Sequence, residues 1–401
     1  MIIINGKIVT MEETGYADGF VRIAGGKIVE LGSMEQFYEK SKKHTKDEEI
    51  LDVHGAWVMP GIIEAHAHIG ITEEKWGLIG DDCNEDTRPI TPTLRAIDAI
   101  NPMDPAFHDA IKAGITSVMV GPGSSNVVGG QFVFMKTQGR CVDNMIVKEP
   151  AAMKVAFGEN PKTAFGDKEQ FPSTRMGVAA LLRKTLYDAK QYYTKQYCKD
   201  MTQNNEKTQN STDNNFELEA WIPVFQKEIP LKVHAHRADD ILTAIRIAKE
   251  FDVDITIDHG TESHLIVDEI KEAGFPVIVG TDLTSRSKIE VQNMNFKTNK
   301  ILRDAEVLFA ITTDHPVALI QYLPICAGLA VRNGLEMKDA LEAITINPAK
   351  ICRVEDRVGS LKVGKDADIA IFDDNPLETF TNTLYTIIDG EIVYKRNESK
   401  M

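Results

Sequence analysis

Short apolar segments alternate with amphipathic, helix-forming segments through the middle of this 401-residue chain. Strands that are buried on both faces are almost continuously apolar, so this alternation predicts parallel strands connected by helices. The predicted strands cover residues 57–69, 114–120, 131–137, 151–158, 231–236, 253–259, 275–280 and 307–314. Eight such strands favour an α/β fold of the (β/α)8 TIM-like barrel type over the alternative, a doubly wound open sheet.

The two ends of the chain show a different pattern, which is rich in hairpin signals. Three dipeptides between apolar stretches predict tight turns: Asn5-Gly6, Gly25-Gly26 and Asp389-Gly390. Residues 366–372 supply a further strand beside the last of them. We therefore expect residues 1–56 and 355–401 to pair into one small β-sandwich domain, with the barrel of residues 57–354 inserted into it.

Local signals mark some boundaries within the barrel. Asp104 followed by Pro105 predicts a capped helix start, and Gly274 predicts a helix end. Residues 192–219 are polar and rich in Asn, Gln and Thr, with few side chains to bury. We expect this segment to be a polar surface insertion in the barrel.

The charge and cysteine content narrow the classes of partner. A formal charge of −15 would repel phosphate backbones and anionic lipid, so neither nucleic acid nor a membrane is expected as a partner. No signal peptide and no apolar run of membrane-spanning length is evident. The five cysteines form no CxxC pair, which favours a reducing, cytoplasmic setting. We expect a homo-oligomer that acts on a small-molecule substrate.

The C-terminal ends of several predicted strands carry side chains of the kinds that bind metal ions. These residues are His66, His68, His234, His236, His259 and Asp314. His66 and His68 are two positions apart, so in a strand both imidazoles point to the same face. Barrel active sites lie at the C-terminal ends of the strands. Imidazole and carboxylate ligands suit zinc or another first-row divalent ion, so the pattern predicts a metal site.

The motifs around these residues resemble those of the amidohydrolase superfamily, in the branch related to imidazolonepropionase and the Xaa-Pro or Xaa-Arg dipeptidases. They are "VMPGIIEAHAHI" (58–69), "VHAH" (233–236), "DHG" (258–260), "TTDHP" (312–316) and "INPAKICRVEDRVGSLKVGKDADIAIFD" (346–373). The resemblance covers nearly the whole chain. It implies the same barrel and a metal-dependent hydrolase that acts on carbon–nitrogen bonds other than, or including, small peptide bonds.

The resemblance also implies roles for individual residues. His66 and His68 would hold one metal ion, His234 and His259 a second, and Asp314 would contact a metal and the attacking water. Zinc is the expected metal, with iron or manganese as alternatives. A metal-activated water would hydrolyse an amide, a cyclic amide or a small peptide bond, with Asp314 as the general base.

Several points stay open at the level of sequence. The anion that bridges two metal ions would be Lys154 as a carbamate, or else Glu159, and a mononuclear site is the alternative. Glu159, His236 and Gln131 are candidates for substrate binding, and His236 is also an alternative ligand. Gln131 ends the glycine-rich segment 121–131, which follows the second predicted strand.

Two other functions compete with amide hydrolysis. Deaminases of the superfamily typically place a glutamate three residues after the histidine of the fifth strand, and here that position is Arg237, which disfavours deamination. The second competitor is a catalytically inert metal-binding relative. A complete set of ligands from His66 to Asp314 argues against it, because an inert scaffold has no need of an open water site.

Overall fold

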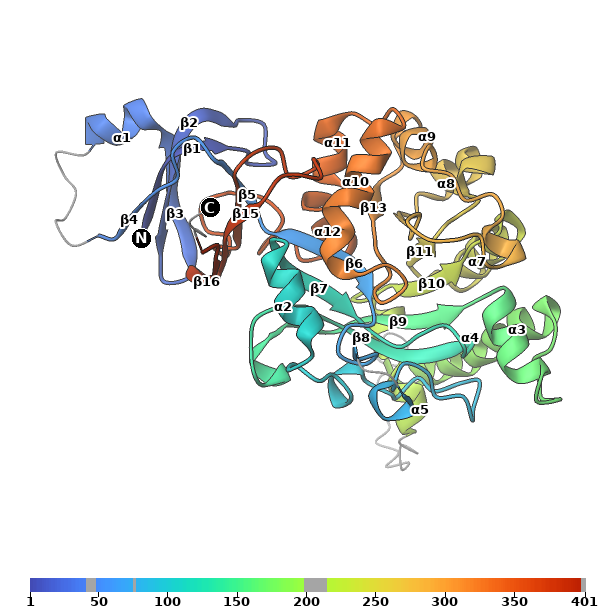
Figure 1. Cartoon of the computed structure of the whole chain (residues 1–401). Coiled ribbons are helices and arrows are strands. Elements are labelled where there is room, and N and C mark those ends of the chain that lie inside the picture. Colours follow the sequence, from blue (N-terminus) through green and yellow to red (C-terminus); the bar gives the residue numbers. More distant parts are fainter. Residues whose placement is uncertain (41–47, 75–76, 198–214, 398–401) are drawn as a thin grey trace, which may run out of the picture.

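A computed structural model describes residues 1–40, 48–74, 77–197 and 215–397. Its strands form two eight-stranded sheets that lie side by side (Figure 1). The barrel sheet consists of β6 (Ile62–Ala67), β7 (Ile115–Val120), β8 (Val128–Lys136), β9 (Ile146–Ala156), β10 (Leu231–Ala235), β11 (Ile255–His259), β12 (Val277–Val279) and β13 (Phe309–Ile311). They follow one another in the sheet in chain order.

The barrel is nearly closed, because the segment after β13 returns to β6. Thr312 Oγ1 donates a hydrogen bond to the carbonyl oxygen of His66 at 2.8 Å. Glu64 of β6, which is fully buried, accepts hydrogen bonds from the Thr313 backbone N–H at 2.9 Å and from the Thr313 hydroxyl at 2.6 Å. These bonds fix the residues just before Asp314 against the strand that carries His66.

All eight predicted barrel strands are present, but one runs in the opposite direction. β8 pairs antiparallel with both β7 and β9, whereas the other neighbouring pairs of this sheet are parallel. The connection from β7 to β8 covers only residues 121–127 and contains no helix. A parallel crossover needs a dozen or more residues, so this short loop permits only an antiparallel return. The expectation of eight parallel strands is wrong at this position.

Helices pack on the outside of the barrel (Figure 1). They are α2 (Pro105–Lys112), α3 (Glu159–Gly166), α4 (Arg175–Tyr197), α5 (Phe216–Glu219), α6 (Ile222–Phe225), α7 (Ala238–Phe251), α8 (Val267–Ala273), α9 (Thr298–Asp304), α10 (Leu323–Arg332), α11 (Met337–Glu342) and α12 (Ile346–Ile351). Asp104 caps α2 by accepting a hydrogen bond from the Ala106 N–H, and Gly274 ends α8 in the left-handed conformation, both as predicted.

The predicted polar insertion at residues 192–219 is partly helical. Its first residues continue α4 through Tyr197, and its last residues form α5. Tyr192 donates a hydrogen bond to Glu219 at 3.1 Å, which joins the two ends. Residues 198–214 lie outside the described residues.

The second sheet joins the two ends of the chain. It contains β1 (Ile2–Ile8), β2 (Tyr16–Ala24), β3 (Lys27–Ser33), β4 (Ile50–Asp52), β5 (Trp57–Pro60), β14 (Ile369–Phe372), β15 (Thr383–Ile388) and β16 (Glu391–Lys395), and α1 (Met34–Lys40) follows β3. β14 from the C-terminal part pairs with β5, which pairs with β1. Because all eight strands belong to one hydrogen-bonded sheet, the expected sandwich of two sheets is not confirmed.

Two of the three predicted turns in this sheet are present. Gly25-Gly26 joins β2 to β3, and Asp389-Gly390 joins β15 to β16. Asn5-Gly6 is instead part of the continuous strand β1, where the register shifts and Asn5 has a φ of +56°. The dipeptide thus forms a bulge rather than a turn.

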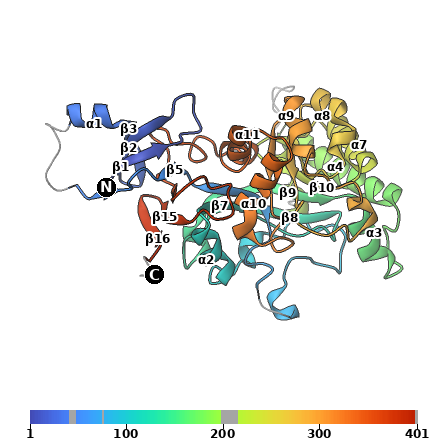
Figure 2. The same ribbon diagram turned by 45° about the horizontal axis from the view of Figure 1, so that its top comes forward.

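The terminal sheet extends from one side of the barrel in both views (Figure 1, Figure 2). A buried charge cluster ties the two together, since Lys136 at the end of β8 binds Asp366 at 3.0 Å and also binds Asp368. Asp366 receives a further hydrogen bond from Arg357 at 2.7 Å. Within the described ranges, no helix is long and apolar enough to cross a membrane.

Candidate metal centre

Two groups of three side chains stand at the C-terminal end of the barrel. The first group is His66, His68 and Asp314, and we call it the first trio. Asp258 Oδ2 lies 2.8 Å from His66 Nδ1, and the Gly121 carbonyl oxygen lies 2.7 Å from His68 Nδ1. Each ring is therefore held through Nδ1, which leaves Nε2 directed at Asp314. The Nε2 atoms of His66 and His68 lie 3.6 and 3.4 Å from Asp314 Oδ1.

The second trio is His234, His236 and His259, from the ends of β10 and β11. The Gly280 carbonyl oxygen lies 2.9 Å from His259 Nδ1, and Thr261 Oγ1 lies 2.8 Å from His236 Nδ1. One ligand nitrogen from each of the three rings falls within 4.8 Å of the others. The structure thus groups His236 with the two histidines expected for a second metal ion.

Both trios belong to one site. The rings of His66 and His259 lie 5.0 Å apart between their centroids, and His259 Nδ1 is 3.7 Å from Asp314 Oδ2. The two trios lie close together because the parallel strands that carry them end at the same edge of the barrel.

Lys154 lies beneath this site, on β9. Its side chain is fully buried, and Nζ is 3.4 Å from His66 Nε2. Its charge adds to the effect of burial in lowering the pKa of His66, His234 and His259. Among the described residues, none of the ion pairs found at 4.0 Å or less includes Lys154. Burial lowers the pKa of Lys154 to about 8.

The electrostatics of the side chains favour a bound cation. Burial, together with the neighbouring histidines, lowers the pKa of His234 and His236 well below the usual range, so both imidazoles are neutral. Burial alone would raise the pKa of Asp314, but His259 and His68 hold it below its usual range, so the carboxylate is ionised. Neutral imidazole and ionised carboxylate are the forms that bind metal ions.

His68 differs from these histidines. Burial would lower its pKa, but Cys83 and Asp314 together raise it to about 10. A metal ion at the first trio would therefore displace a proton from His68.

A metal ion fits the chemistry of these residues. Two buried atoms of these side chains, His234 Nδ1 and Asp314 Oδ1, make no hydrogen bond of standard geometry among the described residues, although His68 Nε2 lies 3.4 Å from Asp314 Oδ1. A buried acceptor without a partner is costly, and a divalent cation would satisfy both. Imidazole nitrogens with one carboxylate form the donor set of zinc and related ions.

The trios face a cavity of about 330 Å³. Its lining includes every member of the two trios except His66. Most of the remaining lining side chains carry a hydroxyl or amide group: Thr72, Asn84, Ser124, Asn160, Thr261, Thr281, Thr284, Ser285 and Ser287. A cavity of this size with polar walls suits a small polar molecule.

Glu159 and Gln131 do not line this cavity. Glu159 begins α3, and its backbone N–H donates to Glu290 Oε2 at 2.9 Å. Gln131 lies on β8, and its side-chain amide donates to the Pro92 carbonyl oxygen at 3.1 Å. The glycine-rich segment reaches the cavity through Gly123 and Ser124 instead.

Several residues that contribute to the site were not among those predicted from the sequence. Asp258 and Lys232 form a buried ion pair of 3.2 Å behind His66, and Asn160 and Lys288 line the cavity. Asp258 belongs to the motif that carries His259, and Lys232 directly precedes the motif that carries His234, so their position in buried strands was a signal that could have identified them. Nothing in the sequence around Lys288 distinguishes it from a surface lysine.

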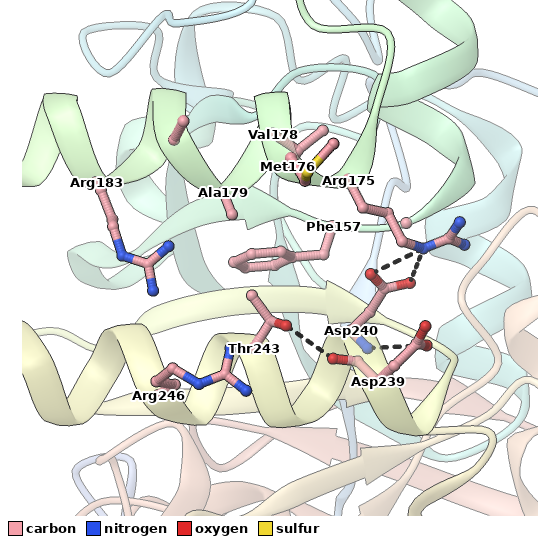
Figure 3. A pocket seen from close by; sticks show the side chains of 12 residues that line it. Phe157, Arg175, Met176, Val178, Ala179, Arg183, Asp239, Asp240, Thr243 and Arg246 are labelled. Atoms are coloured by element: carbon pink, nitrogen blue, oxygen red, sulfur yellow. Dashed lines mark hydrogen bonds and ion pairs between the residues drawn. The ribbon is translucent and has the colours of Figure 1, made fainter.

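A second hollow lies apart from the histidines, in a groove of about 500 Å³ between α4 and α7 (Figure 3). The Phe157 ring lies between the two helices, and Arg175 binds Asp240 at 3.0 Å (Figure 3). Neither trio contributes to its lining. The cavity at the two trios is therefore the candidate site for chemistry.

Comparison with known proteins shows the family of this chain. The model of the amidohydrolase family matches residues 57–393. The chain belongs to the amidohydrolase family. The crystal structure of an amidohydrolase from Thermotoga maritima is 39% identical, with a TM-score of 0.90, over 98% of this chain and 100% of that one.

Curated relatives are more distant. Amidohydrolase tasK of Hapsidospora irregularis is 28% identical over 91% of this chain, which spans only 39% of the length of that relative. Imidazolonepropionase of Colwellia psychrerythraea is 24% identical over 90% of this chain and 86% of its own length. A structure of a Xaa-Pro dipeptidase, at 18% identity and a TM-score of 0.57 over 98% of this chain and 99% of that one, shares the fold.

Proposed function

We propose that this protein is a metal-dependent hydrolase that cleaves the carbon–nitrogen bond of an amide, a cyclic amide or a small peptide. The observation that carries the proposal is the pair of trios around one small polar cavity. Membership in the amidohydrolase family supports it. We further propose a location in the cytoplasm and a homo-oligomeric state.

The first trio would hold one divalent ion and the second trio another, with zinc as the expected metal. We include His236 with His234 and His259 because all three rings converge. Lys154 would bridge the two ions as a carbamate, since its amine is buried beside His66 and lacks a carboxylate partner among the described residues. Bound ions would lower the pKa of water and polarise the scissile carbonyl group.

Asp314 supplies the proton transfer in this proposal. Its ionised carboxylate accepts a proton from the attacking water while the water oxygen bonds to the carbonyl carbon. The same carboxyl group then donates that proton to the leaving nitrogen as the carbon–nitrogen bond breaks. Asp258 holds His66 through Nδ1, which keeps the opposite nitrogen directed at the reaction centre.

The residue at the position of the glutamate of superfamily deaminases does not support deamination. Arg237, three residues after His234, precedes α7, and its guanidinium binds Asp239 with both hydrogen bonds at 2.9 Å. This side chain provides no carboxylate for protonating a ring nitrogen. Amide hydrolysis is thus the reaction that the site supports best.

The Asp314→Asn variant tests the proposal. This change keeps the shape of the side chain but removes its basicity, so the turnover number per bound metal ion should fall by roughly 100-fold or more in protein that has been reloaded with metal. Turnover of a panel of dipeptides and N-acyl amino acids and elemental analysis are measured together. The control is Asp252→Asn, which removes a carboxylate that is 80% exposed.

Three results would contradict the proposal in different ways. Near-normal turnover by metal-loaded Asp314→Asn would assign the proton transfer to another group. Release of ammonia from aminated heterocycles, without amide hydrolysis, would identify a deaminase. Metal-loaded wild-type protein that converts no member of either panel would indicate an inert metal-binding relative.

A further inference from the structure

Few charged side chains line the catalytic cavity, and one of them is a lysine. Asp81 and Asp314 are the acidic residues of its lining, and Lys288 is its one lysine or arginine among the described residues. The chain as a whole carries a formal charge of −15. Because such a protein repels anions at long range, a lysine inside the cavity affects which molecules can bind there.

Lys288 is held at a defined place beside the second trio. Its Nζ donates a hydrogen bond to Asn160 Oδ1 at 2.5 Å. The amide nitrogen of Asn160 donates to Ser124 Oγ at 2.6 Å and lies 3.4 Å from His234 Nε2. One side chain therefore spans the distance between the ammonium group and a histidine of the candidate metal centre.

The ammonium group keeps free hydrogen-bonding capacity. Glu290 Oε1 is 3.8 Å from Lys288 Nζ, which is too far for a hydrogen bond. Of the three donors of the ammonium group, only the one used by Asn160 has a protein acceptor among the described residues. The side chain is 35% exposed, and Ser285 and Ser287 also line the cavity.

We propose that Lys288 binds a carboxylate of the substrate, which restricts the substrate class to small amides that carry a carboxylate near the scissile bond. N-acyl amino acids and short peptides with a free C-terminal carboxylate are of this class. The inference rests on the proposed hydrolase function and adds a specificity-determining residue to it. A cavity of about 330 Å³ limits such a substrate to the size of a few residues at most.

The test compares each acid with its own carboxamide. Metal-loaded wild type, Lys288→Met and Lys288→Arg are assayed on N-acetyl amino acids and on the corresponding primary amides. Loss of one charge-assisted hydrogen bond should lower kcat/KM for the acids about 10- to 100-fold, mainly through KM, with little effect on the amides. Lys288→Arg should retain most of the preference for acids, because it keeps the charge.

Two controls separate this effect from general damage. Lys297→Met removes the same charge from an exposed position of the same segment and should keep the preference for acids. Elemental analysis should find the same metal content in all variants, because Lys288 belongs to neither trio. An unchanged ratio of acid to amide in Lys288→Met would overturn the inference, whereas hydrolysis itself would still stand.

A binding measurement decides the matter if no substrate is hydrolysed. Calorimetry of the metal-loaded protein with N-acetyl-L-alanine and N-acetyl-L-alaninamide should show tighter binding of the acid to wild type than to Lys288→Met. Carboxylates also bind metal ions directly, so the comparison between variants, rather than the affinity itself, reports on Lys288. Equal binding of the acid by both proteins, or none by wild type, would overturn the inference. Binding that depends on Lys288 without any hydrolysis would instead overturn the proposed reaction.

Discussion

Replacement of Lys154 by methionine tests the most specific feature of the proposed centre, its carbamate bridge. Methionine matches the length of the buried stem but cannot react with carbon dioxide. Without the bridge, the two ions would be held by five histidines and one carboxylate, which compensate little of their charge. We expect Lys154→Met to bind about one equivalent of metal and to lose activity, with partial rescue by added formate or acetate.

The burial of Lys154 increases the fraction of its side chain that is in the neutral form, which is the form that can become a carbamate. Only the neutral amine reacts with carbon dioxide, and burial lowers the pKa of Lys154 from 10.5 to about 8. At pH 7 roughly one tenth of the side chain is then neutral, compared with about one part in 3,000 for an exposed lysine. The burial thus raises the reactive fraction about 300-fold. The metal ions must then hold the product as an anion.

The assay is carbon-13 nuclear magnetic resonance of protein loaded with metal in labelled bicarbonate. Wild type should show one carbamate signal and two metal equivalents, and metal loading should require bicarbonate. Glu159→Gln should keep both, because Glu159 does not line the cavity. The reasoning is refuted if wild type binds two ions without a carbamate signal. If Glu159→Gln alone loses one ion, the bridge belongs to Glu159, and if wild type binds only one ion, the site is mononuclear.

Two further changes test the first trio and the junction between the sheets. The double variant His66→Ala/His68→Ala should lose at least one equivalent of metal by elemental analysis, and full retention would contradict the assignment of the first trio. Asp366, whose side chain is 1% exposed, has its pKa lowered from 3.8 to about 2 by Lys27, Lys136 and Arg357 against the opposing effect of burial. That difference corresponds to about 2.5 kcal/mol of stability above pH 4, which disappears as the pH falls through 2. Denaturant unfolding of Asp366→Asn should show a deficit of about this size at pH 7 that shrinks between pH 4 and pH 2, whereas a deficit independent of pH would exclude the charge as its cause.

The sequence predicted the parts of this fold that depend on local patterns. Each barrel strand appeared as an apolar run, and the two-residue spacing of His66 and His68 was sufficient to direct both imidazoles to one face. A metal site at the strand ends could then be predicted, since parallel strands bring their last residues to one edge of the sheet.

Other features depend on contacts between distant segments, and the sequence could not predict them. The direction of β8 is an exception, because the predicted strands left only residues 121–130 between them, and this short connection could have indicated the antiparallel return. Asn5-Gly6 has the composition of a turn, but the hydrogen bond from Asn5 Nδ2 to Asp52 Oδ2 and the pairing of β1 with three other strands keep it within a strand. The sequence did not show that His236 belongs to the second trio, because its ring contacts Thr261, which lies 25 residues away in the chain.

The two buried lysines of the centre show most clearly why position in the fold matters more than residue type. Lys154 and Lys232 are opposite each other on β9 and β10, and both side chains are almost completely buried. Lys232 lies 3.2 Å from Asp258 Oδ2, so its charge is compensated and it supports the carboxylate that holds His66. Lys154 Nζ lies 3.4 Å from an imidazole nitrogen and has no carboxylate within 4.0 Å among the described residues, and a buried ammonium group without such a partner is costly. Conversion to a carbamate between two cations would remove that cost, so the same residue type would be structural on one strand and chemically reactive on the next.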